Sequence, residues 1–463
     1  MTATKVKTPS IQNLFFQPIS IAPLSIFRVL FGFMMLVSII RFWYHDWIFQ
    51  QYILPDFHFT YLGFDWVKPL SGRSMYYLFY TMAGAALCIM LGLFYKVAAI
   101  VFFLTFTYAE LIDKTNYLNH YYFVSLVSFL MIFLPAQRYF SLDAFFRPSI
   151  KQQLVPAWTI NILKFQLGIV YFYAGLAKLN YDWLVNALPL KIWLPAKSNV
   201  PIIGWLFNYK WSATVFSWTG ALYDLSIPFL LWIKKTRWLA YLAVLGFHLM
   251  TAVLFQIGMF PYIMILSTLI FFPATFHQRI IDFLSFKFKR KQVDMPNFKN
   301  LAYLSYSLKS IQFALIFYIV IQLLIPFRHV LYPGNLYWNE QGYRFSWRVM
   351  LMEKAGYVTF HIYDPVTGKM EQARNYDYLT PSQEKQMSTQ PDMILQFAHF
   401  LKKEYQHKGF VDPKVTAESY VTLNGRKSKV FIDPKVDLTA ISRGWQHKNW
   451  IMPFEEGKSY VIK

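Results

Sequence analysis

Long runs of apolar residues recur along the chain as far as Phe327, separated by short polar or basic connections. Their lengths approach those that an α-helix needs to cross a lipid bilayer. The nine runs lie near residues 26–42, 76–94, 97–112, 121–134, 160–177, 214–232, 238–254, 259–272 and 311–327. The pattern predicts a polytopic α-helical membrane protein in which residues 1–328 form about nine transmembrane helices.

The pattern changes in residues 329–463, where the apolar runs shorten and charged residues become more frequent. Residues 357–363 alternate between apolar and polar positions, which is typical of a β-strand. Apolar residues at helical spacing follow in 393–401. Asn424-Gly425 lies between two short apolar segments and predicts a β-hairpin. We therefore expect a small extramembrane α+β domain in residues 329–463.

The composition supports a membrane protein, because 56% of the residues are hydrophobic and only 15% are charged. The net charge is +21, but the basic residues lie in the loops between apolar runs. That placement indicates membrane topology and lipid headgroups rather than nucleic acid. Cys88 is the single cysteine, so it excludes an internal disulfide and argues against a thiolate metal cluster.

The distribution of basic residues also predicts an orientation. With a cytoplasmic N-terminus, the inside loops carry about fifteen basic residues and the outside loops about nine. Nine crossings then place residues 329–463 on the outer face. No small-residue cleavage site follows the first apolar run, which we interpret as a retained helix. These features favour a bacterial inner-membrane protein with a periplasmic C-terminal domain.

Four segments rich in polar and aromatic residues fall in connections that this topology assigns to one side. They are residues 113–120, 178–183, 255–260 and 338–350. Although they are far apart in the sequence, we expect them to converge at one site at the outer end of the helices.

Lys178 is the candidate with the most chemical consequence, because it ends an apolar helix at the membrane boundary. Its amine either reaches water as an interfacial anchor or is held without water and acts as a base. Asp182 lies four residues later and would pair with Lys178 if the helix continued.

His120 and His248 are the candidate imidazoles, and each has a structural alternative. His120 begins an apolar run, where a hydrogen-bonded boundary residue is common. His248 lies inside an apolar run and needs a partner, either for function or for structure. Trp347 and Met350 are open to interpretation as packing residues. The sequence has no HExxH, GxSxG, P-loop or dinucleotide motif that would indicate the common hydrolase, kinase and dehydrogenase chemistries.

These same residues resemble a known family. The matching stretches are Asp113-Lys114-Thr115 with Asn119-His120, Ala174-Gly175 with Lys178-Leu179 and Asp182-Trp183, Phe247-His248, Phe255 with Ile257-Gly258-Met259-Phe260, Tyr343 with Ser346-Trp347, and Phe431-Ile432-Asp433-Pro434 with Val436-Asp437. In this order they resemble the vitamin K-dependent gamma-glutamyl carboxylases, including bacterial homologues, over nearly the whole chain.

The resemblance implies a nine-helix enzyme that oxygenates a reduced vitamin K-type quinol to its epoxide and adds CO2 to glutamate side chains. It implies that Lys178 is the base that deprotonates the quinol and that His120 assists the carboxylation step. It also implies the two binding sets. The quinol-binding residues are Asn119, His248, Met259, Phe260, Tyr343 and Met350, and the substrate-binding residues are Trp347 and Lys354.

The chemistry of the reaction agrees with these roles. A glutamate γ-proton is too weakly acidic for a side chain to remove, whereas O2-driven oxidation of a quinol supplies the energy to make a stronger base. Such a base must be sheltered from water. Lys178 must be neutral to act, so desolvation must outweigh Asp182. We therefore predict that the turn at Leu179-Asn180 directs Asp182 away from Lys178.

The chain also departs from the animal members of that family. Met352 and Lys354 replace a histidine and an arginine, and only Lys354 keeps a charge that attracts a glutamate carboxylate. Cys88 has no partner for the disulfide of animal members. Those members also continue into a larger outer region that recognises a propeptide, and we do not expect that recognition here.

Two alternatives remain open from the sequence. One is a quinol oxygenase without glutamate carboxylation, and the other is a non-catalytic membrane binder or carrier. The expected co-substrates are reduced vitamin K or menaquinone, O2 and CO2, with no metal. The expected partners are the lipid bilayer, a lipid quinol and a glutamate-containing peptide or protein, with no nucleic acid.

Overall fold

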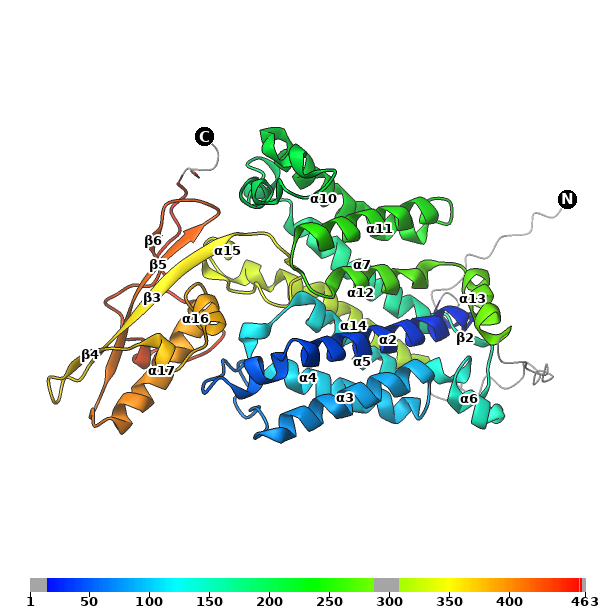
Figure 1. The fold of residues 1–463 in the computed structure, drawn as a ribbon, viewed down its shortest axis with the longest axis horizontal. Helices are drawn as coiled ribbons and strands as arrows, with labels where there is room; N and C mark the ends of the chain where they lie inside the picture. Colours follow the sequence, from blue (N-terminus) through cyan, green and yellow to red (C-terminus); the bar gives the residue numbers. More distant parts are fainter. Residues whose placement is uncertain (1–14, 287–307, 458, 460–463) are drawn as a thin grey trace.

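The structure, a computed structural model, describes residues 15–286, 308–457 and 459. Figure 1 shows long helices lying side by side, with a strand-containing part gathered at one end of them. In the described part of the chain, nine helices lie at the predicted apolar runs, namely α2 (Ala22–Tyr44), α3 (Arg73–Leu91), α4 (Tyr95–Ile112), α5 (Asn119–Phe133), α7 (Trp158–Ala177), α10 (Lys210–Trp232), α11 (Arg237–Leu254), α12 (Phe260–Thr268) and α14 (Leu308–Leu324). Each coincides with one of the nine predicted apolar runs.

Fewer of these helices meet the requirements for crossing a membrane. Among the described residues, six are long and apolar enough, namely α2, α3, α4, α7, α11 and the stretch Lys309–Leu331. A seventh crossing is counted if α12 and α13 (Ala274–Phe286) act as one span, although they meet at a bend of 109°. The protein is therefore an integral membrane protein, but the predicted count of nine transmembrane helices is not confirmed.

The difference has physical causes in each remaining segment. Helix α5 has only 15 residues, which is short for a crossing. Helix α10 is long enough, but polar residues such as Asp224 reduce its hydropathy. The break between α12 and α13 contains Pro273, which cannot donate a helical hydrogen bond.

A buried arginine closes the end of the helical part that lies away from the strands. Arg28 of α2 donates from Nη1 to the Ile89 and Met90 carbonyls at 2.7 Å and from Nε to Ala136 O at 3.2 Å. Met90 lies in the last turn of α3, where carbonyl groups lack helical partners, so Arg28 satisfies one of them. Asp143 accepts from the first backbone N–H groups of α4 in the same corner. Arg28 therefore fixes helix ends at this end of the helical part.

The strand-containing part has a four-stranded antiparallel sheet in the order β4-β3-β5-β6. The strands are β3 (Lys354–Tyr363), β4 (Met370–Gln372), β5 (Lys414–Leu423) and β6 (Lys429–Val430), and the helices with them are α16 (Pro381–Met387) and α17 (Pro391–His407). Buried and exposed residues alternate along β5, and α17 packs against it. The predicted strand, the helix after Pro391 and the hairpin are all confirmed.

The loop of the hairpin is longer than the two residues that Asn-Gly alone predicts. Asn424 and Gly425 both have positive φ, at 52° and 68°, as a tight turn requires. However, the register pairs Val421 with Lys429, so the connection is longer than two residues. Asn424 uses its side chain elsewhere, since it accepts from Glu353 N at 2.8 Å.

Loops of the helical part are built into the strand-containing part, which we call the outer domain because it lies beyond one end of the helices (Figure 1). Phe59, from the loop after α2, is fully buried in the same hydrophobic cluster as Phe397 of α17. Asp113, between α4 and α5, accepts from Gln383 Nε2 at 2.9 Å, and Lys114 pairs with Asp392 at 2.8 Å. These contacts hold the outer domain over the helix ends.

Candidate active site

Two cavities meet beneath the outer domain. One has a volume of about 200 Å³ and is lined mainly by apolar and aromatic residues, and we call it the apolar cavity. The other has a volume of about 470 Å³ and carries many polar groups, and we call it the polar cavity. Both are lined by Ile257, Phe260, Val349 and Met350. The four segments that the sequence predicted to converge all contribute to these two cavities.

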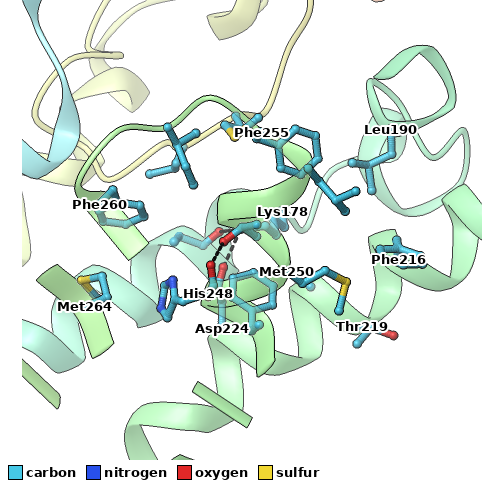
Figure 2. Close-up of a pocket in the computed structure, with 18 of the residues that line it drawn as sticks. Lys178, Leu190, Phe216, Thr219, Asp224, His248, Met250, Phe255, Phe260 and Met264 are labelled. Carbon is cyan, nitrogen blue, oxygen red and sulfur yellow. Dashed lines mark hydrogen bonds and ion pairs between the residues drawn. The ribbon is translucent and has the colours of Figure 1, made fainter. Parts of the chain in front are cut away.

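Lys178 projects into the apolar cavity together with a carboxylate that the sequence did not pair with it. Its Nζ lies 2.5 Å from Asp224 Oδ2 of α10 and 3.3 Å from Ala174 O (Figure 2). The Lys178 and Asp224 side chains are only 7% and 6% exposed. Lys178 is therefore not an anchor that reaches water, and that alternative is wrong.

A close approach of two helices makes this pair possible. A Cβ atom at Gly175 of α7 would lie 2.7 Å from Leu225 N of α10. Only glycine leaves room for that backbone, so Gly175 lets α7 and α10 pack at the level of Lys178 and Asp224.

Asp182 points away from Lys178, as the turn at Leu179-Asn180 predicted. Its carboxylate accepts from Arg426 at 2.6 and 2.7 Å and from Asn424 at 2.8 Å. Burial alone would raise the pKa of Asp182, but the hydrogen bonds from Arg426, Asn424 and Asn186 hold it below its usual value. Asp182 thus ties the helical part to the outer domain.

The expectation that desolvation of Lys178 has only Asp182 to outweigh needs correction. The amine does lie in an apolar environment, but Asp224 takes the place that the sequence considered for Asp182. In a low-dielectric site, an amine and a carboxylate at this distance act as one unit, because separating either from the other leaves an unpaired group. The functional unit at this position is therefore the Lys178–Asp224 pair.

The rest of the apolar cavity is lined mainly by aromatic and aliphatic side chains, with the imidazole of His248 among them. Phe247 stacks on Tyr223 at 4.0 Å between ring centres, and His248 Nε2 lies 2.9 Å from the Tyr171 hydroxyl. Within the described part of the chain, His248 Nδ1 is buried without a hydrogen-bond partner. A polar ligand atom would satisfy that nitrogen.

The apolar cavity also reaches the outer surface of the helices. Val215 of α10 and Met250 of α11 line it and are 50% and 36% exposed. Helix α11 is long and apolar enough to cross a membrane, so the cavity is open toward an apolar surface of the helices.

His120 and Asn119 form one wall of the polar cavity, at the start of α5. Asn119 donates to Arg348 O at 2.9 Å, and the His120 ring centre lies 5.8 Å from that of Phe260. Met259 and Tyr343 complete this region. Burial raises the pKa of Tyr343 well above its usual value, so its hydroxyl group stays protonated.

The polar cavity contains a group of cations that the sequence analysis missed. They are Arg41, Lys114, Arg344 and Arg348, and among the described lining residues Glu340 is the one carboxylate. Arg348 Nε is buried with no hydrogen-bond partner among the residues that the structure describes. The signal in the sequence is the pair Arg344 and Arg348, which flank Trp347 within one of the four segments that were expected to converge.

Two predicted substrate-binding residues lie elsewhere. Among the described residues, neither Trp347 nor Lys354 lines either cavity. Trp347 is 1% exposed and stacks on Tyr122 at 4.9 Å. Lys354 Nζ donates to Glu340 at 2.9 Å and to Trp338 O at 2.8 Å. Burial lowers the pKa of Lys354, although Glu340 opposes this, and the ammonium is already engaged.

The fold and the site together can be compared with known protein families. A bundle of membrane helices holds a buried lysine–carboxylate pair under an outer α+β domain, and residues 16–276 match the family described as HTTM domain. Residues 307–457 match the vitamin K-dependent gamma-carboxylase, lumenal domain. The chain therefore belongs to the vitamin K-dependent gamma-glutamyl carboxylase family, as its sequence predicted. No solved structure matches the chain.

Proposed function

We propose that this protein is a quinol-dependent γ-glutamyl carboxylase. The reaction consumes one reduced naphthoquinone, O2, CO2 and a glutamate side chain, and it yields the quinone epoxide, water and γ-carboxyglutamate. One observation carries the proposal. An apolar cavity with a buried amine opens onto a cationic cavity with an imidazole, so two dissimilar substrates can meet at one boundary.

The apolar cavity is the site for the quinol. When bound there, the reduced naphthoquinone would supply, through its oxidation by O2, a base strong enough to remove a glutamate γ-proton. When the shared proton of the pair lies on Asp224 Oδ2, Lys178 Nζ is a neutral amine that can take a proton from a hydroxyl group in this cavity, and Asp224 then holds the ammonium that results. His248 accepts or donates a hydrogen bond at the same ligand through Nδ1.

The polar cavity is the site for the glutamate side chain. Arg348 and the neighbouring cations attract its carboxylate, since the lining carries more positive than negative groups. His120 lies beside Phe260 at the boundary with the apolar cavity, where it can move a proton during carboxylation. Phe260 and Met350 keep water from the boundary.

The test measures both products together. Purified protein in lipid nanodiscs receives reduced vitamin K, labelled bicarbonate and a glutamate-containing peptide, and quinone epoxide and peptide-bound label are followed over time. We expect both products. Epoxide without label would indicate a quinol oxygenase, and the absence of both products would indicate a binder or carrier.

Two variants separate the assigned roles. Lys178→Ala removes the base and abolishes both products. His120→Ala lowers fixed label more than epoxide, because its role follows quinol oxidation. Equal losses of label and epoxide in His120→Ala would contradict that separate role.

We also propose that α5 and α10 cross the membrane with the six apolar helices and the α12–α13 segment. Nine crossings put the N-terminus and residues 329–463 on opposite sides. The excess of basic residues in the inside loops then puts the N-terminus in the cytoplasm and residues 329–463 in the periplasm of a bacterial inner membrane, where menaquinone is available. Cys88 is the one cysteine, so Cys88→Ser followed by Lys435→Cys places a single label site on the outer domain. A membrane-impermeant thiol reagent should label that cysteine in intact spheroplasts, and labelling only after lysis would reverse the orientation.

A further inference from the structure

A third cavity lies next to the polar cavity and shares Arg344 with it. Its volume is about 150 Å³, and it is formed by the segment after α14, by α17 and by residues near the C-terminus. Among the described lining residues, the ionisable side chains other than tyrosine are the cations Lys114, Arg328, Arg344, Arg443 and Lys448 and the carboxylates Glu340 and Asp392. The lining therefore carries an excess of positive charge. We call this space the basic cavity.

Both carboxylates of the basic cavity already have cationic partners. Asp392 accepts from Lys114 at 2.8 Å and from Arg344 at 2.8 Å. Glu340 pairs with Lys354, outside the lining, at 2.9 Å. Neither carboxylate is left for another cation.

Arg443 finds its partner outside the cavity. It pairs with Asp65, which belongs to the loop between α2 and α3, at 2.6 Å. Its charge is therefore balanced by a group that is not part of the lining.

Two cations remain without a carboxylate among the described residues. Arg328 donates from Nη2 to Arg344 O, and its Nε is buried without a hydrogen-bond partner. The Lys448 ammonium has neither a hydrogen bond nor an ion pair with the described part of the chain. Burial lowers the pKa of Lys448, with Asp392 opposing this, so the ammonium has lost much of its water.

Partly desolvated cations without anions are unfavourable, and a bound anion relieves that penalty. The guanidinium of Arg328 presents a flat edge that suits a carboxylate, and Lys448 adds a point charge. The small volume fits a group the size of a carboxylate or bicarbonate and excludes a nucleotide.

We propose that the basic cavity binds a small planar oxyanion, held by Arg328 and Lys448. The source is either the carboxylate of a second acidic side chain in the peptide or free bicarbonate. This site rests on the proposed function in one respect, which is that the adjoining polar cavity binds a glutamate side chain. Lys114, Glu340 and Arg344 line both the basic and the polar cavity. A peptide with two acidic residues can then place one in each cavity.

The first arm measures peptide binding without quinol or O2, so it does not depend on turnover. Fluorescence anisotropy compares a labelled peptide containing one glutamate with peptides in which a second glutamate is added at increasing spacing. We expect one spacing to bind about tenfold tighter, as one added charge-assisted hydrogen bond would give. Lys448→Gln and Arg328→Gln should each remove most of that advantage.

Two matched variants serve as controls for the peptide-binding measurement. Lys448→Arg keeps the charge and should keep most of the advantage. Lys435→Gln removes an exposed lysine of the same domain and should keep all of it. Thermal unfolding of each variant shows whether the fold is retained.

The second arm tests bicarbonate as the source. Sodium bicarbonate should raise the unfolding temperature of the wild type more than sodium chloride at equal ionic strength, and Lys448→Gln should abolish the difference. A tighter diacidic peptide assigns the site to the substrate, and a bicarbonate effect alone assigns it to the free ion. No diacidic advantage and no bicarbonate effect would overturn the site, while loss of epoxide and label in the turnover assay bears only on the proposed function.

Discussion

The Lys178–Asp224 pair is the residue-scale feature on which the proposed chemistry depends. A lone amine in this cavity would have no fixed position, whereas Asp224 Oδ2 holds Nζ at 2.5 Å from the opposite helix. Removing one member of a buried pair usually destabilises a protein by about 3–5 kcal/mol, because the other is left without compensation. Asp224 is therefore a positioning residue for the base.

The first prediction concerns that carboxylate. Asp224→Asn should lower epoxide formation by roughly a hundredfold or more, the range for loss of a positioned acid–base group. Epoxide and fixed label should fall in parallel, because both depend on quinol deprotonation. Asp224→Glu should recover part of the rate.

Asp182→Asn is the control for this prediction. Asp182 is the other carboxylate near the end of α7, but it contacts Arg426, so its loss should leave epoxide formation close to wild type. Equal losses of epoxide in Asp182→Asn and Asp224→Asn would show that the effect is only structural.

The sequence located Lys178 and His120 because their neighbours repeat a family pattern, but it did not identify their partners. Asp224 is 46 residues from Lys178, and its pairing depends on how α7 and α10 pack. Trp347 and Met350 both have positive φ, at 58° and 52°. Side-chain directions do not follow simple alternation there, so spacing did not reveal that Arg348 lines the polar cavity while Trp347 packs in the core.

At the scale of helices and strands, hydrophobic periodicity was sufficient to place the elements. All nine apolar runs are helices, since an apolar run of this length satisfies its backbone only in that form. Which helices cross the membrane was less predictable. Asp224 makes α10 less apolar, and Pro273 separates the apolar run 259–272 from α13. Asp224, which holds Lys178 in the site, is thus also the residue that makes α10 less apolar as a membrane span.

The second prediction tests the close packing of α7 and α10. Gly175→Ala places a Cβ atom 2.7 Å from Leu225 N, so the helices must separate. Overpacking of this kind costs about 1–3 kcal/mol. We expect a lower unfolding temperature in nanodiscs and a loss of epoxide formation, since Lys178 and Asp224 move apart.

Gly84→Ala in α3 is the matched control for Gly175→Ala. A Cβ atom at Gly84 meets no other atom within 4 Å, so the helix should be unchanged or slightly stabilised. A similar loss of stability in both variants would show that the packing of α7 against α10 is not the cause.

At the scale of the whole molecule, a partly buried ion cluster joins the outer domain to the helical part. Asp392 of α17 forms ion pairs with Lys114, from the loop between α4 and α5, and with Arg344, from the segment after α14. Lys114 and Arg344 also line the polar cavity. The sequence did not predict this cluster, because its members come from three distant segments and each resembles an ordinary surface charge.

The third prediction follows from the charge of Asp392. Burial alone would raise the pKa of the Asp392 carboxyl, but Arg344 and Lys114 hold it well below its usual range. The unfolded chain therefore binds this proton more readily than the folded protein does. The stabilisation is fully present above the unfolded pKa of about 4 and is lost as the pH falls toward the folded value.

Thermal unfolding in nanodiscs between pH 6 and pH 3 measures this dependence. The wild type should lose stability as the pH falls through about 4. Asp392→Asn should be less stable at pH 6, because Lys114 and Arg344 lose their shared anion, and it should show a flatter dependence on pH. If both proteins lose the same stability between pH 6 and pH 3, another carboxylate controls acid unfolding. The docking of the outer domain would then not depend on this cluster.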